Sequence, residues 1–282
     1  MTRDFTLKTY RRLLEALMRQ GYKFCTFTQS LENPPDRYVV LRHDVDRVPR
    51  NSLIFARLQN EMGIRGTYYF RAVPESMNRE IIKEIAALGH EVGYHYEDVT
   101  LTWEKMSRRQ RRQLMKRANY EEVLAGSSVE LFRSHLEDLR SLTQVTTACM
   151  HGSPLSRWDS RMMWRYFDYK KFGIIGEPYF DVNYNEVLYL TDTGRRWDGS
   201  SVSIRDKVLP GGDRKRSRES QIQFRTTFNV IEASERGILP DKILITIHPQ
   251  RWTDRLDHWV AELIYQNIKN SVKYFLVIVD NK

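Results

Sequence analysis

The chain has 282 residues, of which 41% are hydrophobic and 12% aromatic, and its 45 basic and 36 acidic residues give a net charge of +9. This size and composition allow a large buried core, which excludes a disordered or fibrous protein, and the length suits one α/β barrel. Two cysteines without C-x-x-C spacing exclude a disulfide framework and a zinc finger. With no secretory leader pattern and no apolar run of about 18 residues, we expect a soluble, cytoplasmic protein without a membrane span.

The first half of the chain alternates amphipathic helices with short apolar strands. Helical spacing of apolar residues, each time followed by a glycine, predicts helices at 5–20, 51–62 and 77–88. Runs rich in β-branched and aromatic residues predict strands at 38–41, 67–70 and 91–94. This alternation indicates right-handed crossovers and a parallel sheet.

The second half continues the pattern with longer intervals. We expect two helices across 104–142 and single helices near 219–236 and 255–269. Further strands are expected at 146–150, 187–190, 243–247 and 274–279. About seven parallel strands in an α/β chain favour a barrel over an open sheet.

No repeat, low-complexity stretch or long linker divides the chain, so residues 1–282 are expected to form a single domain. Residues 155–220 interrupt the regular alternation with several tryptophans and the polar run GGDRKRSRES at 211–220. We interpret 155–220 as an elaborated insertion in the second half of the barrel that ends in a mobile loop.

Histidines follow four of the predicted strands at the point where each strand ends: His43, His95, His151 and His248. Because the carboxyl ends of the strands of a parallel barrel meet at one mouth, these side chains are expected to gather there. One histidine at a strand end is more often a hydrogen-bonded structural residue than a ligand. Four such histidines together favour a functional site.

Asp44 and Asp46 follow the strand at 38–41. In extended backbone, residues two apart point to the same side with Cα atoms about 7 Å apart, so one carboxylate can bind a metal while the other faces its water. The alternative is a turn in which the carboxylates pair with backbone N–H groups, Arg42 or Arg47. Carboxylate and imidazole ligands suit zinc, or iron, manganese or cobalt, better than calcium.

Three motifs resemble those of the polysaccharide deacetylase family, carbohydrate esterase family 4: VVLRHDVD at 39–46, GHEVGYHYED at 89–98 and LITIH at 244–248. The resemblance implies a distorted (β/α) barrel and a metal-dependent hydrolase that removes acetyl groups from an N- or O-acetylated sugar or polysaccharide. It implies Asp44 as the catalytic base, Asp46 and His95 as metal ligands, and His248 as the general acid.

Two features depart from the family pattern. A valine separates the two aspartates of the first motif, and the second histidine of the family's H-x-x-x-H motif falls on Val99. His151 is the expected replacement ligand because it ends a strand of its own, and Glu97 and Asp98 are the alternatives.

The segment YLTDTGRRWDG at 189–199 occupies the place of the family's fourth motif. By resemblance, a charged residue here orients the acid histidine and a tryptophan walls the sugar pocket, so we assign Asp192, Arg195 and Trp197 to substrate binding. Trp197 and Trp252 are candidates for stacking on a sugar, although packing in the core is the commoner role of a buried tryptophan.

The segment SRRQRRQLMKR at 107–117 supplies much of the positive charge. As a helix it is typical of the solvated face of a barrel helix, and contact with an acidic polymer or an anionic membrane surface is the alternative. The chain contains no nucleic-acid-binding motif, so the expected partner is an acetylated carbohydrate.

Two other functions stay open on the sequence alone. The missing ligand at Val99 is compatible with a metal-free amide hydrolase on the same barrel. A non-catalytic relative that only binds carbohydrate is the other possibility, since a fold does not determine a function. The presence of both Asp44 and His248 weighs against the non-catalytic relative.

Overall fold

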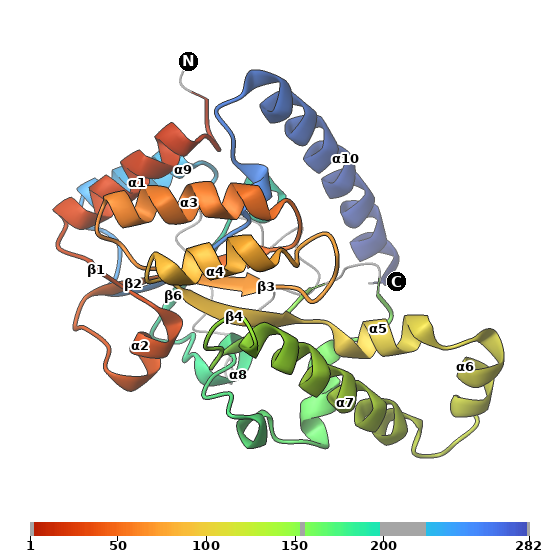
Figure 1. The fold of residues 1–282 in the computed structure, drawn as a ribbon. Coiled ribbons are helices and arrows are strands. Elements are labelled where there is room, and N and C mark those ends of the chain that lie inside the picture. Colours follow the sequence, from red (N-terminus) through yellow and green to blue (C-terminus); the bar gives the residue numbers. More distant parts are fainter. Residues whose placement is uncertain (1–2, 153–155, 198–223, 281–282) are drawn as a thin grey trace.

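The computed structural model describes residues 3–152, 156–197 and 224–280, and its centre is one curled sheet of seven parallel strands (Figure 1). The strands are β1 (Lys23–Cys25), β2 (Tyr38–Val45), β3 (Thr67–Phe70), β4 (Glu91–Tyr96), β5 (Ala148–Met150), β6 (Leu188–Thr191) and β7 (Lys242–Ile247). Their order is β5-β4-β3-β2-β7-β6, and β1 pairs with the first three residues of β2. Among the described residues β5 and β6 do not pair, so the barrel is open on that side.

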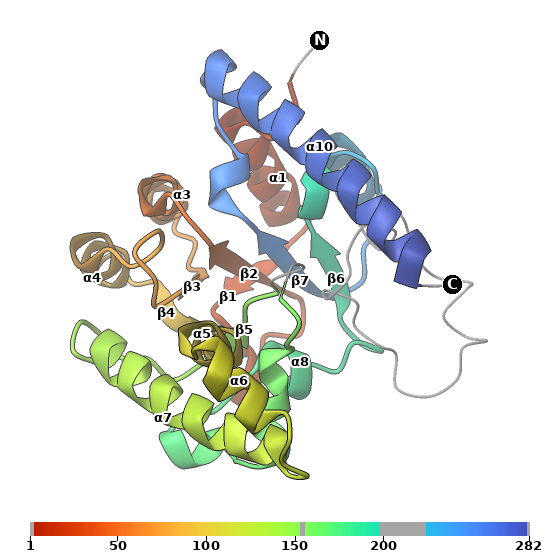
Figure 2. The same cartoon turned by 90° about the vertical axis from the view of Figure 1, so that its right-hand side faces the viewer.

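Helices cover the convex side of the sheet and extend beyond its carboxyl edge (Figures 1 and 2). They are α1 (Leu7–Arg19), α2 (Phe27–Glu32), α3 (Pro49–Glu61), α4 (Arg79–Ala87), α5 (Asp98–Lys105), α6 (Arg108–Leu114), α7 (Tyr120–Arg140), α8 (Pro178–Asp181), α9 (Thr227–Glu235) and α10 (Leu256–Asp280). Figure 2 shows α1, α3, α4 and α7 arranged in an arc around the strands. The prediction of a distorted (β/α) barrel with about seven parallel strands is confirmed.

The alternation of side chains along β2 separates two hydrophobic clusters. Val39, Leu41 and Val45 belong to the large cluster between the sheet and the helices, whereas Tyr38 and Val40 belong to a smaller cluster inside the curve of the sheet. Successive side chains of a strand point to opposite faces, so the even-numbered residues of β2 point into the barrel. Polar residues that continue this inner row beyond Val40 therefore lie at the mouth.

The last predicted strand, at 274–279, is wrong because these residues form the end of α10. Residues 255–280 contain neither glycine nor proline, so nothing ends the helix before the β-branched run begins. The seventh strand is instead β1, whose three residues are too few to show a periodic pattern. The strand count is right, but one of its members is not.

Three helices, α5, α6 and α7, occupy the region in which two were expected. Ser107 accepts a hydrogen bond from the backbone N–H of Gln110, and the Gln110 side chain accepts one from the backbone N–H of Ser107. This capping box starts α6 as a separate helix. The described part of the 155–220 insertion contains short helices and β6, and the run at 211–220 lies outside the described residues.

Within the described residues, no helix combines the length and the apolar character that are needed to cross a membrane.

Candidate metal and catalytic site

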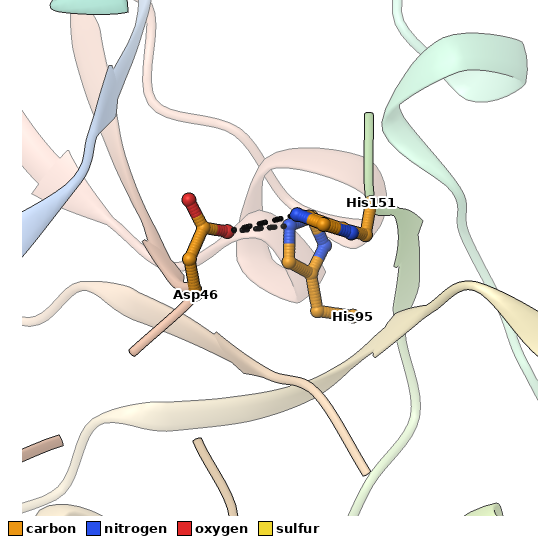
Figure 3. Close-up of side chains that lie close together, drawn as sticks. All are labelled: Asp46, His95 and His151. Atoms are coloured by element: carbon orange, nitrogen blue, oxygen red, sulfur yellow. Dashed lines mark ion pairs between the residues drawn. The ribbon is translucent and has the colours of Figure 1, made fainter. Parts of the chain in front are cut away.

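Asp46, His95 and His151 lie together at the carboxyl edge of the sheet (Figure 3). They come from the end of β2, from β4 and from the end of β5. Asp46 Oδ1 lies 3.6 Å from His95 Nε2 and 3.5 Å from His151 Nε2. This oxygen is buried, and no group among the described residues donates a hydrogen bond to it.

These distances are too long for hydrogen bonds but suit ligands of a shared cation. Two ligand atoms on a tetrahedral zinc ion, each about 2.0–2.2 Å from it, are about 3.3–3.5 Å apart. One carboxylate oxygen and two imidazole nitrogens are a donor set that divalent transition metals accept. The three residues therefore form a candidate metal site.

Hydrogen bonds on the far side of each imidazole direct its other nitrogen at Asp46. His95 Nδ1 lies 2.9 Å from the carbonyl oxygen of Cys149, and His151 Nδ1 lies 2.9 Å from Glu97 Oε2. Each Nδ1 donates to its oxygen, which leaves the lone pair of each Nε2 facing the carboxylate. Both rings are thus oriented as metal ligands usually are.

Burial raises the pKa of the Asp46 carboxyl, but His95, His151 and His248 outweigh burial and hold the pKa well below its usual range. Asp46 is therefore an anion at neutral pH.

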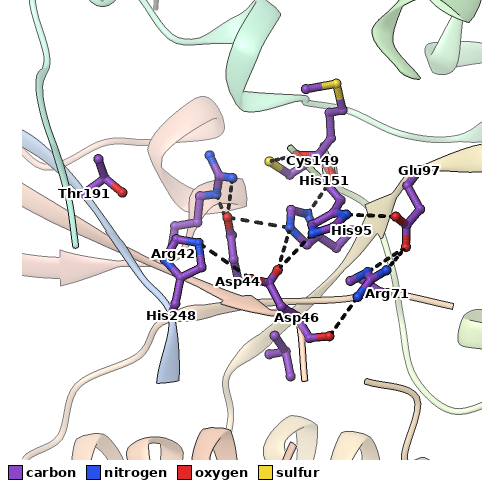
Figure 4. Close-up of polar contacts among 12 residues, drawn as sticks. Arg42, Asp44, Asp46, Arg71, His95, Glu97, Cys149, His151, Thr191 and His248 are labelled. Atoms are coloured by element: carbon purple, nitrogen blue, oxygen red, sulfur yellow. Dashed lines mark hydrogen bonds and ion pairs between the residues drawn. The ribbon is translucent and has the colours of Figure 1, made fainter. Parts of the chain in front are cut away.

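Asp44 lies beside this cluster and is held by Arg42 from the same strand (Figure 4). Arg42 donates from Nε to Asp44 Oδ1 at 2.8 Å and from Nη2 to Asp44 Oδ2 at 2.6 Å. Asp44 Oδ2 also lies 3.7 Å from His95 Nε2. Burial raises the pKa of Asp44, but Arg42, His95 and His248 outweigh it and hold the pKa below its usual range. The pairing with Arg42, which the structural alternative supposed, and the position next to the cluster therefore occur together.

His248 follows β7 and is oriented by Asp192, which follows β6. Asp192 Oδ1 lies 2.6 Å from His248 Nδ1, and Asp192 Oδ2 accepts the backbone N–H of His248 at 2.9 Å. Arg251 and Trp252 also donate to the Asp192 carboxylate, at 2.9 and 2.7 Å. His248 Nε2 then lies 3.9 Å from Asp46 Oδ2, on the side of the candidate metal site.

The three residues assigned to substrate binding lie in the interior. Asp192 is fully buried behind His248. The Arg195 guanidinium lies 4.7 Å from the ring centre of Trp259 and donates to the Trp259 carbonyl oxygen, and Trp197 Nε1 donates to Thr227 Oγ1. This placement contradicts direct contact with a substrate because their polar groups bind other parts of the chain. Asp192 instead orients His248.

Trp252 is also buried, and its ring packs on Phe5 at a centre distance of 4.9 Å. Packing in the core is therefore its role here.

His43 does not join the other three histidines. Its ring stacks on Tyr68 at a centre distance of 4.1 Å, and its nitrogens contact Thr67 O and Gln59 Nε2 at 3.1 and 2.8 Å. Burial lowers the pKa of His43 to about 3, so the ring is neutral at physiological pH. The expectation of four converging histidines is wrong at His43 because, on an extended strand, it points opposite to Asp44.

Of the three alternatives for the missing ligand, His151 presents a nitrogen to Asp46. Glu97 lies behind His151 and bonds to its Nδ1. Asp98 accepts hydrogen bonds from Tyr94 Oη at 2.8 Å and His135 Nδ1 at 2.7 Å. Val99 is fully buried in the large hydrophobic cluster.

Two polar residues of the site were missed by sequence reasoning. Gln250 Nε2 donates to Asp46 Oδ2 at 3.0 Å, and Arg71 Nη1 donates to the carbonyl oxygen of Asp46 at 3.0 Å. The signal for Arg71 was present, because it directly follows β3 just as the other site residues follow their strands. Gln250 lies two residues after His248 and could have been found from that proximity.

No protein-family model and no curated protein sequence matches the chain. Among solved structures the chain is similar to a Streptococcus mutans CE4 esterase, at 12% identity, 91% coverage of this chain, 90% coverage of that chain and a TM-score of 0.39. It is also similar to a family 4 carbohydrate esterase from Bacillus anthracis, at 11% identity, 93% and 86% coverage and a TM-score of 0.36.

A third similar structure is the family 4 carbohydrate esterase from Streptomyces lividans in complex with acetate, at 12% identity, 85% coverage of this chain, 91% of that chain and a TM-score of 0.35. The interpretation of the site therefore rests on the residues of this chain and their geometry.

Proposed function

We propose that the protein is a metal-dependent hydrolase that removes acetyl groups from an N- or O-acetylated sugar or polysaccharide. The observation that carries the proposal is the buried Asp46 Oδ1, which has no hydrogen-bond donor among the described residues and faces two imidazole nitrogens. In this proposal Asp46, His95 and His151 hold a divalent metal, for which zinc fits the donor set best. When bound, the metal supplies Lewis-acid polarisation of the acetyl carbonyl and a water of lowered pKa.

Asp44 and His248 carry the proton transfers of this proposal. Asp44 is anionic and held in place by Arg42, so its carboxylate is available to accept the proton of the attacking water. His248 Nε2 faces the same place and is backed by the Asp192 carboxylate, which stabilises the protonated imidazole. His248 then donates a proton to the departing amine or alcohol of the sugar.

The acetylated sugar as substrate is supported by the resemblance of the motifs at 39–46, 89–98 and 244–248. The metal-free hydrolase is the competing function, and the unpaired Asp46 oxygen argues against it because an orphaned buried carboxylate oxygen is costly. The non-catalytic binding module is disfavoured by the Asp192–His248 pair, which a binding site does not require.

Metal analysis of the purified protein combined with a screen of acetylated sugars tests the function. We expect one equivalent of metal, release of acetate from at least one acetylated mono- or oligosaccharide, and loss of that activity after chelation. Activity that survives complete removal of the metal would establish the metal-free hydrolase. A protein that binds metal and sugar but releases no acetate from any of them would establish the binding module.

A further inference from the structure

Arg71 connects two of the segments that carry the candidate metal ligands. It follows β3, its Nε donates to Glu97 Oε1 at 2.6 Å and its Nη1 donates to the carbonyl oxygen of Asp46 at 3.0 Å. Its Nη2 forms an ion pair with the same Glu97 oxygen. One guanidinium thus ties the end of β2 to the end of β4, as Figure 4 shows.

Glu97 continues this connection to the third segment. While Oε1 accepts from Arg71, Oε2 lies 2.9 Å from His151 Nδ1. Glu97 is 4% exposed, and both of its oxygens are therefore bound on the inside of the protein. The chain of contacts runs from the Asp46 backbone through Arg71 and Glu97 to His151.

His151 needs such support more than His95 does. The His95 side chain is 2% exposed, and its Nδ1 bonds to a main-chain carbonyl, so its position is set by the sheet. The His151 side chain is 15% exposed and lies just beyond the last residue of β5, where strand pairing ends. Packing alone holds its ring less firmly, and the bond to Glu97 fixes which nitrogen faces Asp46.

We propose that Glu97 and Arg71 are positioning residues that hold the His151 imidazole and the Asp46 segment in the arrangement that binds the metal. The inference rests on the proposed function, since it presupposes that Asp46, His95 and His151 bind a metal. It assigns a purpose to two residues that replace, from outside the ligand set, the order lost where Val99 stands in place of a histidine.

Zinc affinity by competitive titration and the absorption spectrum of the cobalt-loaded protein test the inference. We expect Glu97→Gln and Arg71→Gln each to weaken zinc binding by about 10- to 100-fold and to change the cobalt spectrum. Arg71→Lys should recover part of the affinity, because lysine keeps the charge but cannot bind both oxygens as a planar fork does.

Asp98→Asn is the matched control. Asp98 is the next residue along the chain, is fully buried and pairs with the Nδ1 of a histidine, His135, at 2.7 Å. It resembles Glu97 in all these respects but bonds to no candidate ligand among the described residues. We expect Asp98→Asn to lower the melting temperature of the metal-free protein without changing zinc affinity or the cobalt spectrum.

The outcomes separate the inference from the proposed function. If the wild-type protein binds no metal, the proposed function and the inference both fail. If the wild type binds zinc and the Glu97 and Arg71 variants match its affinity and spectrum, the inference alone is overturned. Equal loss of affinity in the Asp98 control would also overturn it, by showing that any destabilisation of this segment suffices. Should Glu97→Gln not fold, Arg71→Lys decides, because the Arg71 side chain is 19% exposed and tolerates change.

Discussion

Replacement of Arg42 by methionine removes one partner of the most deeply buried ion pair that contacts the site. The side chains of Arg42 and Asp44 are 3% and 5% exposed, and two hydrogen bonds of 2.8 and 2.6 Å join them. Methionine fills much of the arginine volume without its charge, so the variant leaves the Asp44 carboxylate buried with no guanidinium. The cost comes from the isolated charge rather than from a cavity.

The magnitude follows from the burial of the pair. Removing one partner of a buried ion pair destabilises a protein by about 3–5 kcal/mol. With an unfolding entropy of about 2.1 cal/mol/K per residue, the 282-residue chain has about 0.6 kcal/mol/K in total, so Arg42→Met should lower Tm by about 5–8 °C.

The pH dependence of this loss has a definite sign. In the wild type the folded-state pKa of Asp44 is depressed, so its contribution is complete above the unfolded-state pKa of about 3.9 and is lost as pH falls through the folded-state value. The stability difference between wild type and Arg42→Met should therefore be largest near neutral pH and should shrink below about pH 4.

Denaturant unfolding of the metal-free proteins, at several pH values between 3.5 and 7.5, measures this difference. The double variant Arg42→Met/Asp44→Asn is the control, because it removes the charge that the single variant strands, and it should recover most of the lost stability. A difference that does not change with pH, or a double variant no more stable than the single one, would refute the role of the stranded charge.

Three further predictions concern the roles proposed for the site. Asp46→Ala and His151→Ala should each leave a folded protein that has lost tight metal binding, by titration; a variant that retains stoichiometric metal would show that its residue is not a ligand. Asp44→Asn should keep the metal but lower kcat by about 100-fold or more, and turnover close to wild type would rule out its role as base. Asp192→Asn should leave zinc affinity unchanged while lowering kcat by about 100-fold, because His248 loses the carboxylate that orients it; an unchanged kcat would contradict that dependence.

The parts of the fold that sequence patterns predicted are those with strong local periodicity. The strands at the centre of the sheet, β2 and β7, are fully or almost fully buried, and continuous apolar runs marked both. β1 and the end of α10 were misjudged for opposite reasons. Three residues of β1 gain their strand geometry from pairing with β2, which no local pattern encodes, whereas the β-branched end of α10 continues a helix that no glycine or proline interrupts.

The site was predictable where strand alternation decides the direction of a side chain. Asp44 and Asp46 share a face because they are two residues apart, and the same rule excludes His43, which the strand-end argument alone wrongly included. The burial of Arg195 and Trp197 was not predictable, because it depends on their packing against Phe5, Thr227 and Trp259, which are distant in sequence.

The order of the strands explains how a ligand can move from one loop to another. β4 and β5 are neighbours in the sheet, and Tyr96 pairs with Met150, so the residue after β5 lies beside the loop that follows β4. A histidine placed there reaches the same point that a histidine further along the loop after β4 would reach, and the backbone N–H of His151 bonds to the carbonyl oxygen of Tyr96 at 2.8 Å. Glu97, freed from serving as a ligand, then bonds to His151 from the side away from Asp46. A substitution such as Val99 can therefore be accommodated without changing the sheet, because a parallel sheet presents several neighbouring strand ends to one point.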